Sequence, residues 1–156
     1  MSDSLTPQTT PRPDDPDVRQ VLDHIAAAHT ILLTTHEGAD GDGTGAELAL
    51  AHALRGLGKT VTVMHGGPLS RRFVFMDRHA DIRVFRPEFA GEILAADLVL
   101  LIDTCELRRT GTLCEAITAR TKPTLAIDHH PSNGKSIDGM LRSDFSSTGE
   151  LMVHVM

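Results

Sequence analysis

Short apolar runs alternate with segments of helical periodicity along most of this chain. The runs are rich in Leu, Ile, Val and Thr, as in "TILLTT", and each has the length and composition of a buried strand. They cover residues 30–35, 60–64, 81–85, 97–103 and 123–128, and helical spacing covers 16–29, 46–57, 89–96 and 111–120. Strands that alternate with helices pair in parallel through crossover connections. The pattern predicts an α/β fold, a Rossmann-like three-layer domain with a mostly parallel sheet and helices on both of its faces.

The length of the chain bounds the number of domains. With 156 residues, of which 40% are apolar, it can form one hydrophobic core and not two. Residues 1–15 are mostly polar or Pro, so we expect a disordered tail followed by one folded domain over 16–156. Ser147 and Glu150 have capping-box spacing and begin a last helix, which has no stop signal before Met156. We therefore expect a truncated piece of a longer protein.

Charge and cysteine content argue against several classes of partner. The net charge of −6 disfavours duplex DNA, whose binding depends on phosphate neutralisation by Lys and Arg. No apolar run approaches the roughly 20 residues of a membrane span, and the N-terminus lacks a signal-peptide pattern. Cys105 and Cys114 form no CxxC motif, which indicates reduced thiols. These features predict a cytoplasmic protein without a membrane partner.

Acidic and histidine side chains stand at the ends of three predicted strands. Ligands of an open parallel sheet bind beyond the carboxyl ends of its strands, so these side chains should meet at one rim. They are His36, Asp40 and Asp42 after the first strand, Asp103 at the end of the fourth, and Asp128, His129 and His130 at the end of the fifth. His65, at the end of the second strand, could line the same crevice. The sequence thus predicts one cluster of carboxylates and imidazoles.

Carboxylates crowded in this way repel one another unless a cation lies among them. Carboxylate oxygens with imidazole nitrogens and no thiolate suit Mn²⁺ or Mg²⁺ best, and Fe²⁺, Co²⁺ or Zn²⁺ would also be accepted. Seven candidate donors exceed what one catalytic ion needs, which favours two ions. Pairs of ions about 3.5–4 Å apart are a common solution for phosphoester hydrolysis.

The loop after the first strand also satisfies G-x-G-x-x-A over residues 41–46, the fingerprint of dinucleotide-binding folds. That fingerprint places a pyrophosphate against backbone N–H groups, and Asp40 and Asp42 would repel it. The acid expected at the end of the second strand to bind ribose is also missing, because that strand runs into "MHGGP". We favour the interpretation that the glycines let the chain turn tightly and direct both Asp side chains at a cation.

Three motifs resemble those of the DHH phosphoesterase family, which is named for the triplet found here at 128–130. "TTHEGADGDGTGAELAL" resembles the family's first motif, "LVLLIDTCELRRTG" its second and "AIDHHPSN" its third, in the same order. "DFSSTGELM" is similar to the helix start that follows in the branch of oligoribonucleases and phosphoadenosine phosphatases (pAp phosphatases). The resemblance covers residues 20–156, nearly all of the expected folded part.

The resemblance implies two Mn²⁺ ions, with Mg²⁺ or Co²⁺ as substitutes. The implied ligands are His36 and Asp40 for one ion, Asp42 and His129 for the other, and Asp103 as a bridge between them. His130 would act as a catalytic and substrate-binding residue at the scissile phosphate, and Asp128 would take part in catalysis by orienting a His ring or the Asp-rich loop. Arg109 is a further candidate for contact with a phosphate. Because side chains alternate in extended chain, the adjacent imidazoles should point opposite ways and serve different partners.

The function implied by the resemblance is that of a metal-dependent phosphoesterase, which hydrolyses short oligoribonucleotides, 3′-phosphoadenosine 5′-phosphate or both by attack of a metal-bound hydroxide. A cyclic-dinucleotide phosphodiesterase and a non-catalytic relative that binds metal or nucleotide are the alternatives. The family carries a further Asp ligand and a smaller substrate-binding domain beyond the last motif, and this chain ends before either. We therefore expect a hydrolase fragment that binds short RNA or a phosphorylated nucleotide, and a homodimer is compatible with the sequence.

Overall fold

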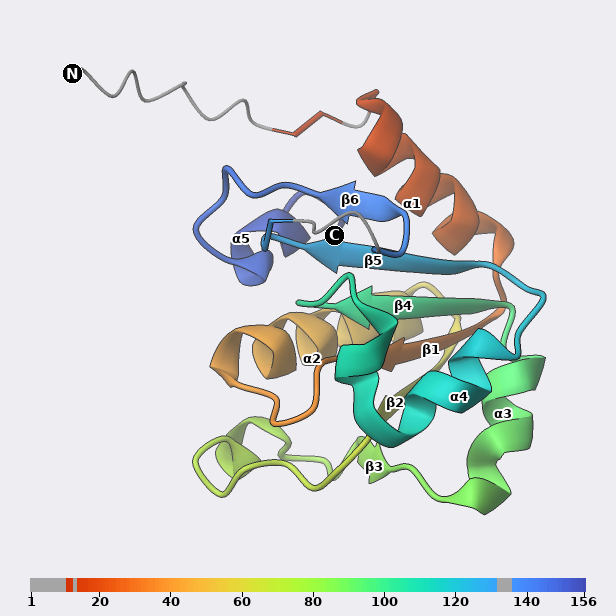
Figure 1. Ribbon diagram of the computed structural model, residues 1–156. Coiled ribbons are helices and arrows are strands. Elements are labelled where there is room, and N and C mark those ends of the chain that lie inside the picture. The colour runs from red at the N-terminus through yellow and green to blue at the C-terminus, as the bar shows by residue number, and fades with distance from the viewer. Residues whose placement is uncertain (1–10, 13, 132–135) are drawn as a thin grey trace.

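The computed structural model describes residues 11–12, 14–131 and 136–156, and within them six strands form one parallel sheet in the order β3-β2-β1-β4-β5-β6 (Figure 1). The strands are β1 (Thr30–Thr34), β2 (Thr60–His65), β3 (Ile82–Val84), β4 (Leu98–Ile102), β5 (Thr124–Asp128) and β6 (Gly139–Leu141). The helices are α1 (Pro16–Ala27), α2 (Gly41–Gly56), α3 (Ala90–Ala95), α4 (Cys114–Thr118) and α5 (Thr148–Met152). Strand order runs outward in both directions from β1 and β4, so the topological switch point lies between them. The predicted Rossmann-like fold is confirmed.

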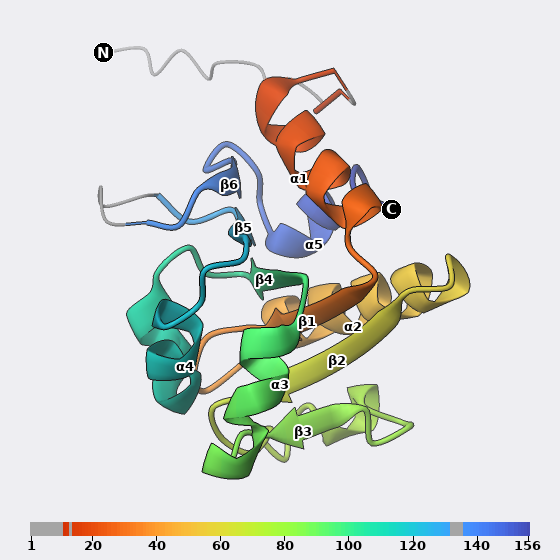
Figure 2. The ribbon, with the colours of Figure 1, turned by 90° about the vertical axis from the view of Figure 1, so that its right-hand side faces the viewer.

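Helices cover both faces of the sheet (Figures 1 and 2). Ile31 and Leu33 of β1 pack in one cluster with α1, α2 and α5. Leu32, between them, packs in a second cluster with Ile93 of α3 and Ile117 of α4. This alternation follows from the pleat of the strand, which sends successive side chains to opposite faces. Two separate cores therefore fix the sheet from both sides and leave its carboxyl edge to the connecting loops.

Five predicted strands are confirmed as β1 to β5, but the sequence pattern does not predict β6. This strand has three residues, and its first is Gly139 with φ +148°. A Cβ at Gly139 would lie 2.0 Å from the carbonyl oxygen of Ala126, so only glycine permits this pairing with β5. The signal for β6 is thus a backbone contact and not an apolar run.

Two predicted helices have different limits in the structure. The helix expected over 46–57 begins earlier, at Gly41, because Asp40 caps its N-terminus. The helix expected over 111–120 is reduced to α4, which follows a 3₁₀ segment at Leu107–Leu113. Gly111 interrupts the helical backbone there with φ 62° and ψ −126°. Most of the predicted tail over 1–15 lies outside the described residues. None of the helices in the described ranges combines the length and apolar character that a bilayer span requires.

Candidate metal centre

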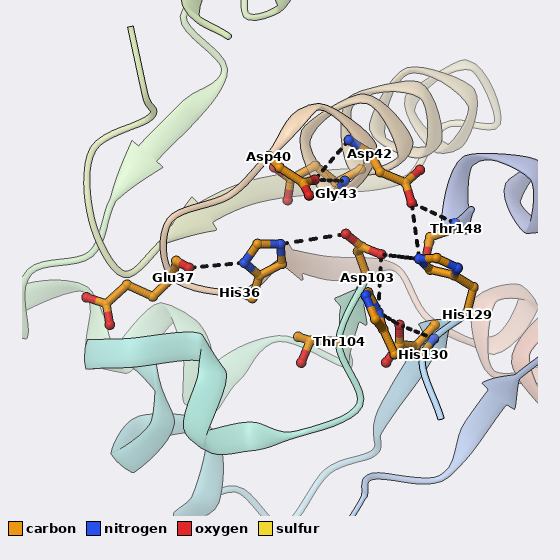
Figure 3. A network of polar contacts seen from close by, with 12 residues as sticks. His36, Glu37, Asp40, Asp42, Gly43, Asp103, Thr104, His129, His130 and Thr148 are labelled. Atoms are coloured by element: carbon orange, nitrogen blue, oxygen red, sulfur yellow. Dashed lines mark hydrogen bonds and ion pairs between the residues drawn. The ribbon is translucent and has the colours of Figure 1, made fainter. Parts of the chain in front are cut away.

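The acidic and histidine residues singled out in the sequence meet at the carboxyl edge of the sheet, beside its switch point (Figure 3). His36 follows β1, Asp103 follows β4, and Asp128 ends β5. These three strands are neighbours in the sheet, in the order β1-β4-β5. Their loops therefore converge, and the start of α2 adds Asp40 and Asp42 from the side.

The start of α2 is held by the carboxylate of Asp40. Its Oδ1 accepts hydrogen bonds from the backbone N–H groups of Asp42 (3.0 Å) and Gly43 (3.1 Å). These N–H groups are the kind that a dinucleotide fold offers to a pyrophosphate, and here they are already engaged by the acid. A Cβ at Gly43 would lie 2.5 Å from Thr35 Oγ1 and 3.3 Å from Asp103 Oδ2. Glycine at this position therefore lets α2 approach β1 and β4 closely, which supports the cation interpretation over the dinucleotide one.

Asp103 lies at the centre of the cluster and is 1% exposed. Its Oδ2 is 3.6 Å from Nε2 of His36. Its Oδ1 is 3.7 Å from Nε2 of His129 and 3.7 Å from Nδ1 of His130. Asp103 also has φ +61°, which is strained for a residue other than glycine. The fold therefore holds the backbone of Asp103 in an unfavourable conformation. In that conformation one carboxylate oxygen faces His36 and the other faces His129 and His130.

The orientation of each imidazole is fixed through its Nδ1 atom. Nδ1 of His36 lies 3.0 Å from the carbonyl oxygen of Glu37, and Nδ1 of His129 lies 3.3 Å from that of Phe145. A carbonyl oxygen only accepts, so in both rings Nδ1 is the donor and Nε2, which faces the carboxylates, is the atom available to a cation. Nδ1 of His130 lies 2.7 Å from Oδ1 of Asp128. Such outer contacts are the usual means of orienting histidine ligands of a metal.

Two groups of donors have the spacing that a divalent cation needs. Ligand atoms of His36, Asp40 and Asp103 lie within 4.8 Å of one another, and so do those of Asp103, His129 and His130. Two donors that are each about 2.1 Å from one ion lie at most about 4.2 Å apart. The separations of 3.6 and 3.7 Å between Asp103 and these imidazoles meet that limit. The residues therefore fit a pair of divalent cations, with Asp103 common to both groups.

Asp42 lies beside His129 and is also held by the start of α5. Its Oδ2 lies 3.7 Å from Nε2 of His129, but both carboxylate oxygens accept backbone hydrogen bonds from the start of α5. Thr148 N–H donates to Oδ2 and Gly149 N–H to Oδ1, each over 2.8 Å. His130 is the third member of the group that the donor spacing gives, but its Nδ1 is engaged by Asp128, so Asp42 as the ligand beside His129 stays a prediction.

The expectation that His129 and His130 point in opposite directions is wrong. Their ring centroids are 4.3 Å apart with a tilt of 55°, and both rings reach the same oxygen of Asp103. The reason is that β5 ends at Asp128, so the alternation of an extended strand no longer applies to the two residues after it. Both imidazoles therefore face Asp103 from the same side of the sheet edge.

Hydrogen bonds from the chain itself also hold the carboxylates. Asp40 and Asp42 accept backbone N–H groups, Asp103 accepts the hydroxyl of Thr148, and Asp128 pairs with His130. Interaction with Asp103 raises the pKa of His36 above its ordinary value. Burial tends to raise the pKa of Asp103, but His36, Thr148 and His130 outweigh it, and the net direction is downward. The expectation that only cations make this crowding tolerable is therefore too strong.

Other residues named from the sequence lie outside these contacts. Arg109 is exposed on the 3₁₀ segment, where its carbonyl oxygen accepts the N–H of Glu37 over 2.6 Å. Its charge tends to lower the pKa of His36, so it lies near the rim of the cluster. His65 does not face the cluster but pairs with Glu47 of α2 in the core. The sequence pattern does not indicate the contacts of Thr148 with Asp103 and Asp42, because a capping box marks only the start of a helix.

Cys105 is predicted to resist alkylation at pH 8, whereas Cys114 reacts. Cys105 is 3% exposed, and burial together with the adjacent Asp128 carboxylate raises the pKa of its thiol to about 11. About one thiol in a thousand would then be ionised at pH 8, and the thiolate is the reactive form. Cys114 is partly exposed at the start of α4. Mass spectrometry after brief iodoacetamide treatment should find label on Cys114 alone, and equal labelling of both residues would contradict the burial of Cys105.

Fold and site together define a parallel α/β domain with a candidate two-cation centre at its switch point. The chain belongs to the DHH family, because the model of that family's N-terminal domain matches residues 30–156. An exopolyphosphatase-related protein from Bacteroides fragilis has a similar structure, with a TM-score of 0.80 and 26% identity over 88% of this chain and 42% of that one. RecJ from Thermus thermophilus, in complex with Mn²⁺, gives a TM-score of 0.54 at 18% identity over 97% of this chain and 22% of that one. At 18% identity the second likeness supports the fold alone, and in both cases this chain spans less than half of the similar protein.

Proposed function

We propose that this chain is the catalytic domain of a phosphoesterase that depends on divalent cations and acts on short oligoribonucleotides, 3′-phosphoadenosine 5′-phosphate or both. The observation that carries the proposal is the pair of donor groups that share Asp103. Membership of the DHH family and the Mn²⁺ bound by RecJ support a divalent cation, and we propose two Mn²⁺ ions. Cations held there would neutralise phosphoryl oxygens and lower the pKa of water.

The chain's own residues would bind and orient in this reaction. His36, Asp40 and Asp103 would hold one cation, and Asp42, His129 and Asp103 the other, which the short separations between these donor atoms support. Asp128 keeps the proton of His130 on Nδ1, so that the ring holds a fixed direction at the opening of the cluster. We propose that His130 contacts the scissile phosphate from there. Arg109, exposed near the rim, would contact a more distant phosphate of the substrate.

A direct assay of substrates tests the proposed function. The purified full-length protein is incubated with Mn²⁺ and a diribonucleotide, 3′-phosphoadenosine 5′-phosphate, a cyclic dinucleotide or inorganic polyphosphate. We expect mononucleotides from the first or AMP from the second, and no product after EDTA removes the cations. Product from the cyclic dinucleotide alone would favour a cyclic-dinucleotide phosphodiesterase. Hydrolysis of polyphosphate alone would assign the activity suggested by the similarity to the B. fragilis protein, and no product from any substrate would favour a non-catalytic relative.

A further inference from the structure

Thr148 connects two acids that come from different parts of the cluster. This residue is fully buried at the start of α5. Its hydroxyl Oγ1 donates to Oδ1 of Asp103 over 2.8 Å, and its backbone N–H donates to Oδ2 of Asp42 over 2.8 Å (Figure 3). One acid follows β4 and the other begins α2, so a single residue sets the position of one relative to the other.

The hydroxyl of Thr148 is not the cap of its own helix. Ser147 is the N-cap of α5, and its Oγ accepts the backbone N–H of Glu150 over 3.0 Å. Glu150 in turn accepts hydrogen bonds from the N–H and hydroxyl of Ser146. The N–H groups at the start of α5 are thus taken by Asp42 and Ser147, and the Thr148 hydroxyl is left to serve Asp103.

We propose that Thr148 is a positioning residue of the cation centre, which fixes the carboxylate of Asp103 between the two donor groups. The inference rests on the proposed function of that centre. Asp103 has φ +61°, a backbone conformation that persists only when surrounding contacts hold it, and the Thr148 hydroxyl is one of these contacts. The hydroxyl occupies one lone pair of Oδ1 and stops the carboxylate from rotating, and the other lone pair stays directed at the imidazoles. Loss of an outer partner of this kind typically lowers metal affinity about 10- to 100-fold.

Three variants separate this role from a role in helix stability. Thr148→Val removes the hydroxyl but keeps the branched shape and the N–H to Asp42. Thr148→Ser keeps the hydroxyl, and Ser147→Ala removes the cap of α5 without touching either acid. We expect isothermal titration calorimetry to show Mn²⁺ binding about 10- to 100-fold weaker for Thr148→Val, with near wild-type affinity for Thr148→Ser and Ser147→Ala. Loss of kcat should follow the loss of affinity.

Each other outcome overturns the inference. Wild-type affinity in Thr148→Val would show that the hydroxyl does not position Asp103. An equal loss in Ser147→Ala would show that Thr148 acts only through α5. Should Thr148→Val fail to fold, Thr148→Ala against Thr148→Ser gives the same comparison of a missing and a retained hydroxyl. If the wild-type chain itself takes up no Mn²⁺, the proposed function fails and the inference with it, which is a result distinct from unchanged uptake in Thr148→Val.

Discussion

Asp103→Asn is expected to abolish turnover while the fold stays intact. The substitution removes the negative charge that both donor groups share, so each cation would lose its common ligand. Metal ions contribute several kcal/mol of charge stabilisation in the transition state, and a loss of about 4 kcal/mol corresponds to about 10³-fold in rate. Asn is one of the few residues that tolerate a left-handed backbone, so φ +61° is kept at little further cost. We expect kcat/KM at saturating Mn²⁺ to fall at least about 10³-fold.

Asp23→Asn is the matched control for this prediction. Asp23 lies on α1, exposed, and within the part of the chain that the structure describes it pairs with Arg19, four residues earlier in its helix, at 3.2 Å. The same change of charge at this surface position should leave both activity and the melting temperature near their wild-type values. Activity within about tenfold of the wild type for Asp103→Asn, with a normal melting curve, would mean that the two donor groups do not share a catalytic carboxylate.

The sheet, and the convergence of the acidic and histidine residues at its carboxyl edge, could be predicted because both follow from short-range patterns. Apolar runs of strand length mark β1, β4 and β5, and the rule for parallel sheets then places the residues after them at one edge. β6 could not be predicted in this way, since its pairing depends on the absence of a side chain at Gly139. The break before α4 likewise depends on the backbone angles of Gly111, which have no periodic signal.

The contacts that each residue of the cluster makes could not be predicted, because they depend on segments far apart in the sequence. Asp42 accepts N–H groups from residues more than a hundred positions later in the chain, and only the docking of α5 brings them together. Likewise, nothing in "AIDHHPSN" states that the strand ends at Asp128 and that both imidazoles then turn to the same side. The sequence therefore indicates which residues meet, and the tertiary structure decides how their donor atoms are oriented.

His65→Ala is expected to lower the free energy of unfolding by about 3–5 kcal/mol, although His65 is not part of the cation cluster. Glu47 is 0% exposed and His65 4% exposed. Oε1 of Glu47 forms a hydrogen bond with Nε2 of His65. The other oxygen, Oε2, has no hydrogen-bond partner among the described residues. Burial raises the pKa of Glu47, and the imidazole partly offsets this. Removal of the ring would leave the whole carboxyl group buried without a partner, which is the costly state of a buried polar pair.

The double variant Glu47→Met with His65→Leu tests whether the unpaired acid is the cause. Replacing both members of a buried pair by apolar residues of similar volume is often neutral, so the double variant should be more stable than His65→Ala even though it changes more of the core. His52→Ala, exposed on the same helix α2, should change the free energy of unfolding by less than about 0.5 kcal/mol. Urea denaturation of the three variants measures these differences. If the double variant and His65→Ala lose the same free energy of unfolding, the cost comes from packing around β2. If His65→Ala is as stable as His52→Ala, the pair of Glu47 and His65 does not contribute to stability.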